Sequence, residues 1–378
     1  MNRPLVVLDA LLLRPQPTGV GRSIIELTTA LAAVDRGLDF AVLCTHPELL
    51  SQLADRPHWQ LVNCPGARGG TLRKAAWTQI ALPKLLRRLG ADLLHCLQFV
   101  APLRCPCPSV VTVHDLGYRR YPDTVEEPRR SYYRLLVPTS LRGAAAVVCN
   151  SAATAADVRA TFPAVASRVT VTPFGVPSWT REFTTPPAER APDAPFLFVG
   201  TLEPRKNLSG LLLAYRSFVT ECDAENRQCP QLVLVGGRGW KDSGLRDLLR
   251  PLVAADRVKV LDYCGPAQLW QQYGLARALL FPSLHEGFGF PILEAMVAGL
   301  PVMTSDRGAM AEVAGEAALL VDPLDQATLI AGMRRLTTDG EYCRELVVRG
   351  QRRWRLWSWE ESARTTVETY RRILDLSG

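Results

Sequence analysis

Residues 281–294 read Phe-Pro-Ser-Leu-His-Glu-Gly-Phe-Gly-Phe-Pro-Ile-Leu-Glu and are the most informative stretch of this 378-residue chain. They predict a buried strand, a glycine loop and a short helix over about residues 291–298. Pro291 suits the first helical turn, and Gly299 followed by Pro301 stops the helix. A strand that runs through a loop directly into a helix is typical of α/β proteins with parallel sheets.

The same stretch places two carboxylates, Glu286 and Glu294, on either side of the glycine loop. Gly287 and Gly289 allow a close approach of the backbone to a ligand, and the N–H groups of a helix start attract phosphate. We expect Glu286 before the loop, and Glu294 in the first helical turn, to bind hydroxyls of the molecule that carries the phosphate. This pattern predicts a nucleotide-sugar site. The alternative is an ordinary turn in which one Glu caps the helix and the other complements its dipole.

Length and composition favour two soluble domains. A chain of 378 residues is too long for one ordinary core, and no apolar run is long enough to cross a bilayer. The N-terminus is predicted to be a first strand rather than a signal peptide. The ten cysteines form no Cys-x-x-Cys pair, so we expect most to be buried thiols in a reducing cytoplasm.

The charge is unevenly distributed between the two halves. Residues 1–178 carry 20 Arg and Lys against 12 Asp and Glu, whereas residues 179–378 carry 24 against 25. A basic first half indicates an anionic partner or surface. No nucleic-acid-binding signature is present, so anionic lipid is favoured over nucleic acid.

Short apolar runs alternate with helical patterns along the chain, which predicts two doubly wound parallel sheets facing across a cleft. Pro177 to Pro195 is predicted to connect the two domains, because its prolines interrupt the periodicity. The predicted strands are 5–8, 40–44, 93–95, 110–114, 146–149 and 169–172 in the first half, and 196–199, 231–235, 258–261, 278–281, 301–304 and 318–321 in the second.

Further candidate residues follow predicted strands of the first half. Residues 17–23 contain Gly19 and Gly21 and predict a loop that approaches a phosphate or sugar, or else a plain turn and helix cap. His114 ends another strand, where it could bind a sugar while Asp115 orients its ring, although a lone His is equally often structural.

The second half offers cations and a further glycine turn. Arg205 and Lys206 follow a predicted strand, where they could neutralise a departing diphosphate; the alternative is a solvated surface pair. The glycine-rich turn at 234–240 could form one wall of a pocket for the base of a nucleotide. No Asp-x-Asp pair is present to hold a divalent ion, so we expect no metal requirement. Nucleophile-elbow and phosphate-loop motifs are also missing.

Taken in order, these segments resemble the family 4 retaining, metal-independent glycosyltransferases of the GT-B fold. They are most similar to the bacterial mannosyltransferase-like group that builds O-antigen, capsule or exopolysaccharide. The resemblance covers nearly the whole chain, and its segments are 18–22, 113–116, 119–122, 149–151, 171–176, 200–207, 286–294 and 305–313.

This resemblance implies an acceptor-side domain over 1–178 and a donor-binding domain over 179–359, with a terminal helix over 360–378 that crosses back to the first domain. It implies a catalytic set of Glu286, His114, Arg205 and Lys206. The implied donor contacts are Gly19, Gly21, Gly200, Thr201, Arg205, Lys206, Gly287, Phe288, Gly289, Phe290 and Glu294.

In this reading Arg205 and Lys206 bind the donor diphosphate, Glu286 the transferring sugar and Glu294 the ribose. Guanosine diphosphate mannose is the leading donor, and the acceptor is a saccharide or a lipid-linked saccharide. Thr201 departs from the family pattern, because many members have Arg there. A nucleotide-sugar epimerase and an inactive donor-binding partner of another transferase are the alternatives.

The expected location is cytoplasmic, with possible attachment to the inner face of the membrane. Residues 77–89 mix apolar side chains with Lys84, Arg87 and Arg88, and we expect Pro83 to break regular helix there. Basic and aromatic residues recur over 119–134. Such segments suit docking on an anionic leaflet, and the alternative is an amphipathic helix packed on its own core.

Overall fold

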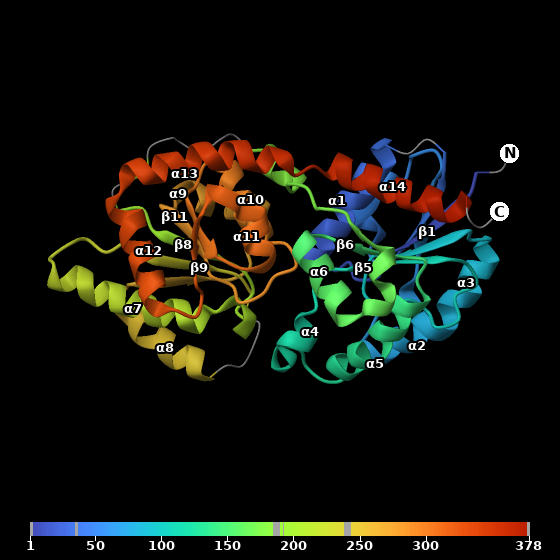
Figure 1. The fold of residues 1–378 in the computed structure, drawn as a ribbon, viewed down its shortest axis with the longest axis horizontal. Coiled ribbons are helices and arrows are strands. Elements are labelled where there is room, and N and C mark those ends of the chain that lie inside the picture. Colours follow the sequence, from blue (N-terminus) through green and yellow to red (C-terminus); the bar gives the residue numbers. More distant parts are fainter. Residues whose placement is uncertain (1–2, 35–36, 184–189, 192, 238–242, 376–378) are drawn as a thin grey trace. The chain divides into compact units, whose positions relative to one another are not determined.

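The computed structural model describes residues 3–34, 37–183, 190–191, 193–237 and 243–375. The chain divides into two compact units, one formed by residues 1–175 with 358–378 and the other by residues 176–357. The sequence places the divisions after residues 178 and 359, and the structural bounds lie three and two residues earlier. Each unit is built on a parallel sheet of its own (Figure 1).

The first unit contains a seven-stranded sheet in the order β3-β2-β1-β4-β5-β6-β7, with every neighbouring pair parallel. Its strands are β1 (Leu5–Asp9), β2 (Asp39–Cys44), β3 (Trp59–Asn63), β4 (Leu93–Cys96), β5 (Ser109–Val113), β6 (Ala146–Cys149) and β7 (Val169–Val171). Its α-helices are α1 (Gly19–Val34), α2 (Thr71–Ala76), α3 (Leu82–Leu89), α4 (Gly117–Arg120), α5 (Arg129–Gly143), α6 (Ala152–Thr161) and α14 (Trp359–Asp375).

The second unit contains a six-stranded parallel sheet in the order β10-β9-β8-β11-β12-β13. Its strands are β8 (Phe196–Val199), β9 (Leu232–Val235), β10 (Val258–Leu261), β11 (Ala278–Phe281), β12 (Val302–Ser305) and β13 (Leu319–Val321). Its α-helices are α7 (Leu208–Ala224), α8 (Ser243–Ala254), α9 (Pro266–Leu275), α10 (Phe290–Val297), α11 (Gly308–Ala314), α12 (Gln326–Thr338) and α13 (Gly340–Arg353).

Both sheets confirm the predicted fold class, two doubly wound parallel sheets. Central strands such as β4, β5 and β8 are buried along their whole length, which is typical of parallel strands covered by helices on both faces. In each sheet the strand order reverses once, between β1 and β4 in the first and between β8 and β11 in the second. Ligands bind in such folds beyond the carboxyl ends of the strands at the point of reversal.

One strand was not predicted. β3 pairs with β2 at the edge of the first sheet, and its residues Trp59–Asn63 are half-buried or exposed. The ring of Trp59 stacks on Phe40 of β2 at 4.4 Å between centroids. An edge strand has one neighbour and needs no continuous apolar run, so its sequence resembles that of a loop.

The regular α-helix is interrupted before Pro83, as expected, but the helical segment does not end there. Residues 71–89 form α2, a π-helical turn over Trp77–Ala81 and α3 in direct succession. A proline ring collides with the carbonyl four residues earlier in a regular helix, and the wider π turn before Pro83 relieves that collision. The backbone N–H of Leu82 accordingly donates to the carbonyl oxygen of Trp77, five residues back.

The segment predicted as a connector contributes to the core of the second unit where it is described. Trp179 is buried, and its ring contacts that of Trp270 in α9 with centroids 6.1 Å apart. Residues 184–189 and 192 of this segment lie outside the described part of the chain.

The chain returns to the first unit through α14, which packs against α1 (Figure 1). The return requires a close backbone contact, because a Cβ atom on Gly175 would lie 2.3 Å from the backbone nitrogen of Trp359. Farther along α14, the hydroxyl of Tyr370 lies 2.5 Å from Nδ1 of His95 in β4, and both side chains are fully buried. These contacts place the terminal helix in the core of the first unit.

Candidate active site

The glycine loop of the second unit has the predicted form, with small shifts in its bounds. β11 ends at Phe281 and α10 spans Phe290–Val297, so the helix begins one residue earlier than expected. Gly289 precedes it with φ of 110°, a left-handed conformation that favours glycine. Glu294 was predicted to lie in the first turn of this helix. The first turn of α10 contains no acidic residue, so Glu294 belongs to the second turn instead.

A second loop lies beside this one. The short 3₁₀ turn Pro204–Lys206 follows β8, the strand adjacent to β11. The backbone N–H of Leu284 donates to the carbonyl of Arg205 at 2.8 Å and so joins the two loops. They therefore meet at the reversal point of the second sheet.

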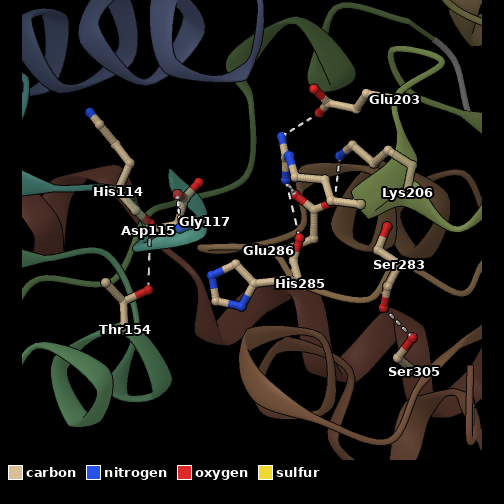
Figure 2. A network of polar contacts seen from close by, with 11 residues as sticks. His114, Asp115, Gly117, Thr154, Glu203, Lys206, Ser283, His285, Glu286 and Ser305 are labelled. Atoms are coloured by element: carbon tan, nitrogen blue, oxygen red, sulfur yellow. Dashed lines mark hydrogen bonds and ion pairs between the residues drawn. The ribbon is translucent and has the colours of Figure 1, made fainter. Parts of the chain in front are cut away.

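Glu286 lies between the two cations of the neighbouring loop (Figure 2). One carboxylate oxygen accepts from Nη1 of Arg205 at 2.9 Å, and the other accepts from Nζ of Lys206. Nη1 of Arg205 also donates to the carbonyl of His285 at 3.1 Å. Three candidates from segments 80 residues apart thus form one cluster, and the solvated surface pair considered for Arg205 and Lys206 is excluded.

The cluster is electrostatically balanced. Nη2 of Arg205 also pairs with Glu203 at 2.7 Å, so two cations face two carboxylates. Burial by itself would raise the pKa of Glu286, but the charges of Arg205 and Lys206 outweigh it and lower that pKa to about 2. Burial lowers the pKa of Lys206, and the charge of Glu286 opposes that shift. Glu203 was not singled out from the sequence, although it belongs to the same 200–207 segment.

Close backbone packing shapes the loop after β8. Gly236, after β9, has φ of 154°, and a Cβ atom there would lie 2.0 Å from the carbonyl oxygen of Gly200. The N–H of Gly200 donates to the carbonyl of Val235 at 2.9 Å. Thr201 follows Gly200 and accepts at its carbonyl from the N–H of Glu203. Of the predicted 234–240 turn, residues 238–240 lie outside the described residues.

Glu294 is buried in α10 and has a partner that the sequence did not indicate. One of its carboxylate oxygens accepts from the hydroxyl of Tyr273 at 2.7 Å, and Tyr273 comes from α9. Before it, Phe288 is buried, and its ring contacts those of Phe290 and Trp357 at 5.3 Å and 5.2 Å. These aromatic contacts hold Phe288 and Phe290, next to the loop glycines Gly287 and Gly289, in place.

His114 belongs to the first unit and follows β5 directly. Its Nε2 lies 3.0 Å from the carbonyl of Leu97, so this nitrogen carries the proton and donates. Burial lowers the pKa of His114 and keeps the ring neutral. Nδ1 is then an acceptor, and it is buried with no hydrogen-bond partner in the described part of the chain. Asp115 does not orient this ring as predicted, because its carboxylate accepts from the N–H of Gly117 at 2.8 Å (Figure 2).

The predicted loop at 17–23 is shorter than expected. α1 begins at Gly19, so Gly21 lies inside its first turn and is buried. A Cβ atom on Gly21 would lie 3.0 Å from the Cβ of Pro17, which makes this glycine a packing residue. Gly19 is exposed at the start of the helix.

The described residues lack two features, a metal-binding cluster and a membrane-spanning helix. They contain no group of three or more His, Cys, Asp or Glu side chains arranged to hold a metal ion. Among the same residues, no helix is both long enough and apolar enough to span a bilayer.

Comparison with known proteins agrees with this architecture. The family model for glycosyl transferases group 1 matches residues 182–353, and that for glycosyltransferase family 4 matches residues 17–178. The chain is 30% identical to O-antigen chain mannosyltransferase B of Escherichia coli, over 79% of this chain and 77% of that protein. It is 27% identical to O-antigen chain mannosyltransferase RfbU of Salmonella typhimurium, over 84% and 87% respectively.

Among solved structures, sucrose-phosphate synthase from Thermosynechococcus elongatus superposes with a TM-score of 0.75 at 23% identity. The match covers 99% of this chain and 100% of that one, and it supports the fold. The sheet order, the two family models and the relative at 30% identity agree, and the chain belongs to the family 4 glycosyltransferases of the GT-B fold.

Proposed function

We propose that this glycosyltransferase moves a hexose, with mannose as the leading candidate, from a nucleoside diphosphate sugar to a saccharide or lipid-linked saccharide. The observation that carries the proposal is the cluster of Arg205, Lys206 and Glu286 at the reversal point of the second sheet. The choice of mannose and of an O-antigen-type acceptor rests on the names of the two mannosyltransferase relatives.

In the proposed donor complex the diphosphate binds Arg205 and Lys206. Both cations already bind a carboxylate, so the diphosphate competes with Glu286 for their N–H donors. Competition frees the Glu286 carboxylate to accept from sugar hydroxyls, while Glu294 in α10 binds the ribose. Arg205 and Lys206 then stabilise the negative charge that grows on the leaving diphosphate. Such stabilisation by preorganised donors is usually the largest single contribution to catalysis.

The proposed reaction proceeds with retention through a front-face route. Glu286 is a poor general base near neutral pH, because its pKa is lowered to about 2. The leaving phosphate oxygen takes the proton of the acceptor hydroxyl instead, as the glycosidic bond to the diphosphate breaks and the new one forms. Nδ1 of His114 and the backbone at Gly19 stay candidates for donor contacts from the first unit.

A thermal-shift panel of nucleoside diphosphates, each with and without EDTA, tests the donor site. We expect one base to raise the unfolding midpoint in wild type, irrespective of EDTA, and not in Lys206→Ala. A guanosine preference supports mannose as the sugar. Loss of the shift with EDTA would contradict metal independence, and an equal shift in Lys206→Ala would contradict the assigned site.

Transfer is then measured with the identified donor and a lipid-linked saccharide acceptor. Lys206→Ala is expected to lower turnover by roughly a hundredfold. Donor turnover without any acceptor would indicate an epimerase. Nucleotide binding with no transfer to the native lipid acceptor would indicate an inactive donor-binding partner.

We also propose that the first unit attaches to an anionic membrane. The apolar face predicted for 77–89 packs on its own core, since Leu82 and Leu86 are buried. Exposed apolar side chains nevertheless remain on this unit, and Lys84, Arg87 and Arg88 are exposed as well. The apolar residues are Leu72, Ile80, Leu103 and Leu135.

Flotation of the protein with liposomes tests this proposal. Flotation is expected to depend on anionic lipid and to weaken in Ile80→Ser. Flotation that is independent of lipid charge would contradict the proposal.

A further inference from the structure

A cavity of about 160 Å³ opens in the first unit, apart from the cluster described above. Its walls come from the segment after β1, the turn before α2 with α2 itself, the segment after β4, and the start of α5. β1 and β4 are the neighbours at which the strand order of this sheet reverses. The cavity thus occupies in the first sheet the position that the Glu286 cluster occupies in the second, which is where such sheets bind ligands.

Three cations line the cavity: Arg14, Lys74 and Arg129. Within the described ranges none of them has a carboxylate partner within ion-pair distance. Nζ of Lys74 donates to the carbonyl of Leu11 at 3.2 Å, a neutral acceptor. This arrangement contrasts with the Glu286 cluster, where each cation has an acidic partner.

One buried acid, Asp9, interacts with Lys74 through its charge and already accepts two hydrogen bonds. Asp9, at the end of β1, is 1% exposed, and its oxygens accept from the N–H of Leu11 at 3.1 Å and from Nε2 of Gln98 at 2.9 Å. Burial raises the pKa of Asp9 and lowers that of Lys74. The nearby charge of Arg14 lowers the pKa of Lys74 further, and the charge of Asp9 opposes these shifts without reversing them. Lys74 is therefore a partly desolvated cation that a bound anion would stabilise.

The remaining walls suit the carbohydrate part of a ligand. Gln98 lines the cavity, and its Nε2 donates to Asp9. Its amide oxygen is therefore available to accept from a sugar hydroxyl. Tyr132 and Tyr133 of α5 and Phe99 contribute aromatic faces, and the rings of Phe99 and Tyr133 are in contact at 5.3 Å. Aromatic faces with a few polar groups are typical of small-molecule sites.

We propose that this cavity binds a phosphate or diphosphate group attached to a sugar, and that the acceptor therefore carries this negative charge next to its sugar. The proposal rests on the transferase function above, since it assigns this ligand to the acceptor. The group can belong to a soluble sugar phosphate or to a lipid-linked diphosphate. Both place the same anion between Arg14, Lys74 and Arg129.

Calorimetric titration of the full chain with a hexose 1-phosphate and with the matching neutral methyl hexoside tests the chemistry. Vesicles with and without a polyprenyl-diphosphate-linked hexose separate the lipid source from the soluble one. We expect the phosphate-bearing probe of at least one source to bind and the methyl hexoside not to bind, with affinity that falls as salt rises. Lys74→Ala is expected to weaken binding by roughly tenfold or more.

Arg73→Ala is the matched control, because Arg73 is an exposed cation of the same helix that does not line the cavity; binding should change less than twofold. Arg129→Ala is a second test variant, since its exposed side chain can be truncated without disturbing the core. Binding that is equal in wild type, Lys74→Ala and Arg129→Ala, or that is absent with every phosphate-bearing probe, would overturn the proposal.

Lys206→Ala separates this inference from the proposed function. Hexose phosphate binding that survives in Lys206→Ala but not in Lys74→Ala places the ligand in the first unit. Binding lost in Lys206→Ala and retained in Lys74→Ala would overturn the inference and leave the donor site standing. Conversely, binding at Lys74 in a protein that binds no nucleoside diphosphate would contradict the proposed function alone.

Discussion

Glu286 determines how much positive charge the candidate active site offers to a ligand. Its carboxylate neutralises one of two cations, and Glu203 neutralises the other. In Glu286→Gln the buried ammonium of Lys206 loses its partner, which lowers the stability of the second unit. We expect a lower unfolding midpoint, a larger midpoint rise on nucleoside diphosphate binding than in wild type, and a dissociation constant smaller by roughly tenfold. Sugar transfer should nevertheless fall by about a hundredfold, because the sugar loses its carboxylate.

Glu203→Gln is the control for this charge change. Glu203 pairs with Arg205, and its side chain is more exposed than that of Glu286, at 17% against 9%. The same neutralisation should therefore change nucleotide affinity and midpoint by a smaller amount. Unaltered nucleotide affinity in Glu286→Gln would show that the ion pairs do not limit the charge available to the diphosphate.

At the scale of elements, the loops after β8 and β9 are held by a backbone contact that only glycine allows. Gly236→Ala would place a methyl group 2.0 Å from the carbonyl oxygen of Gly200, at a positive φ. Gly237→Ala is the matched control, because a Cβ atom there has no neighbour within 4 Å. We expect Gly236→Ala to destabilise the second unit by about 2 kcal/mol or more and to abolish nucleotide shifts, while Gly237→Ala retains both. Similar behaviour of the two variants in thermal unfolding would refute the contact.

At the scale of the whole molecule, the chain leaves the first unit after residue 175 and returns at residue 358, so the terminal helix must be anchored there. His95 is part of that anchor, with Nδ1 facing Tyr370 and Nε2 2.8 Å from Thr112. Burial lowers the pKa of His95 to about 3, whereas the unfolded chain protonates it near 6.5. The unfolded state therefore binds more protons between these values, and stability falls as the pH drops through that window.

We expect the unfolding free energy of the first unit to decrease by about 1.4 kcal/mol per pH unit between about pH 5.5 and about pH 4 from this group alone. His95→Gln should remove that part of the slope. Tyr370→Phe should lower stability at every pH but keep the slope, because the histidine remains. Urea unfolding at a series of pH values measures both, and an unchanged slope in His95→Gln would contradict the assignment.

Local sequence patterns were sufficient for most elements of the two sheets and for the loop before α10. Apolar runs that alternate with helical periods indicate which residues are buried. Gly289 and Pro291 indicate backbone conformations that few other residues adopt. These signals are local, because they depend on the conformation of neighbouring residues. For β3 the local pattern was insufficient, because this edge strand forms by pairing with β2 elsewhere in the chain.

The partners of the candidate residues were decided by the tertiary structure. Arg205 and Glu286 meet because β8 and β11 are neighbours in a sheet whose order reverses between them, and no local pattern encodes strand order. The same holds for Tyr273 beside Glu294 and for the cations of the first-unit cavity, which come from the loop after β1, from α2 and from α5. The sequence by itself determines which chemical groups are present. Their charge balance and burial depend on which distant segments the fold brings into contact.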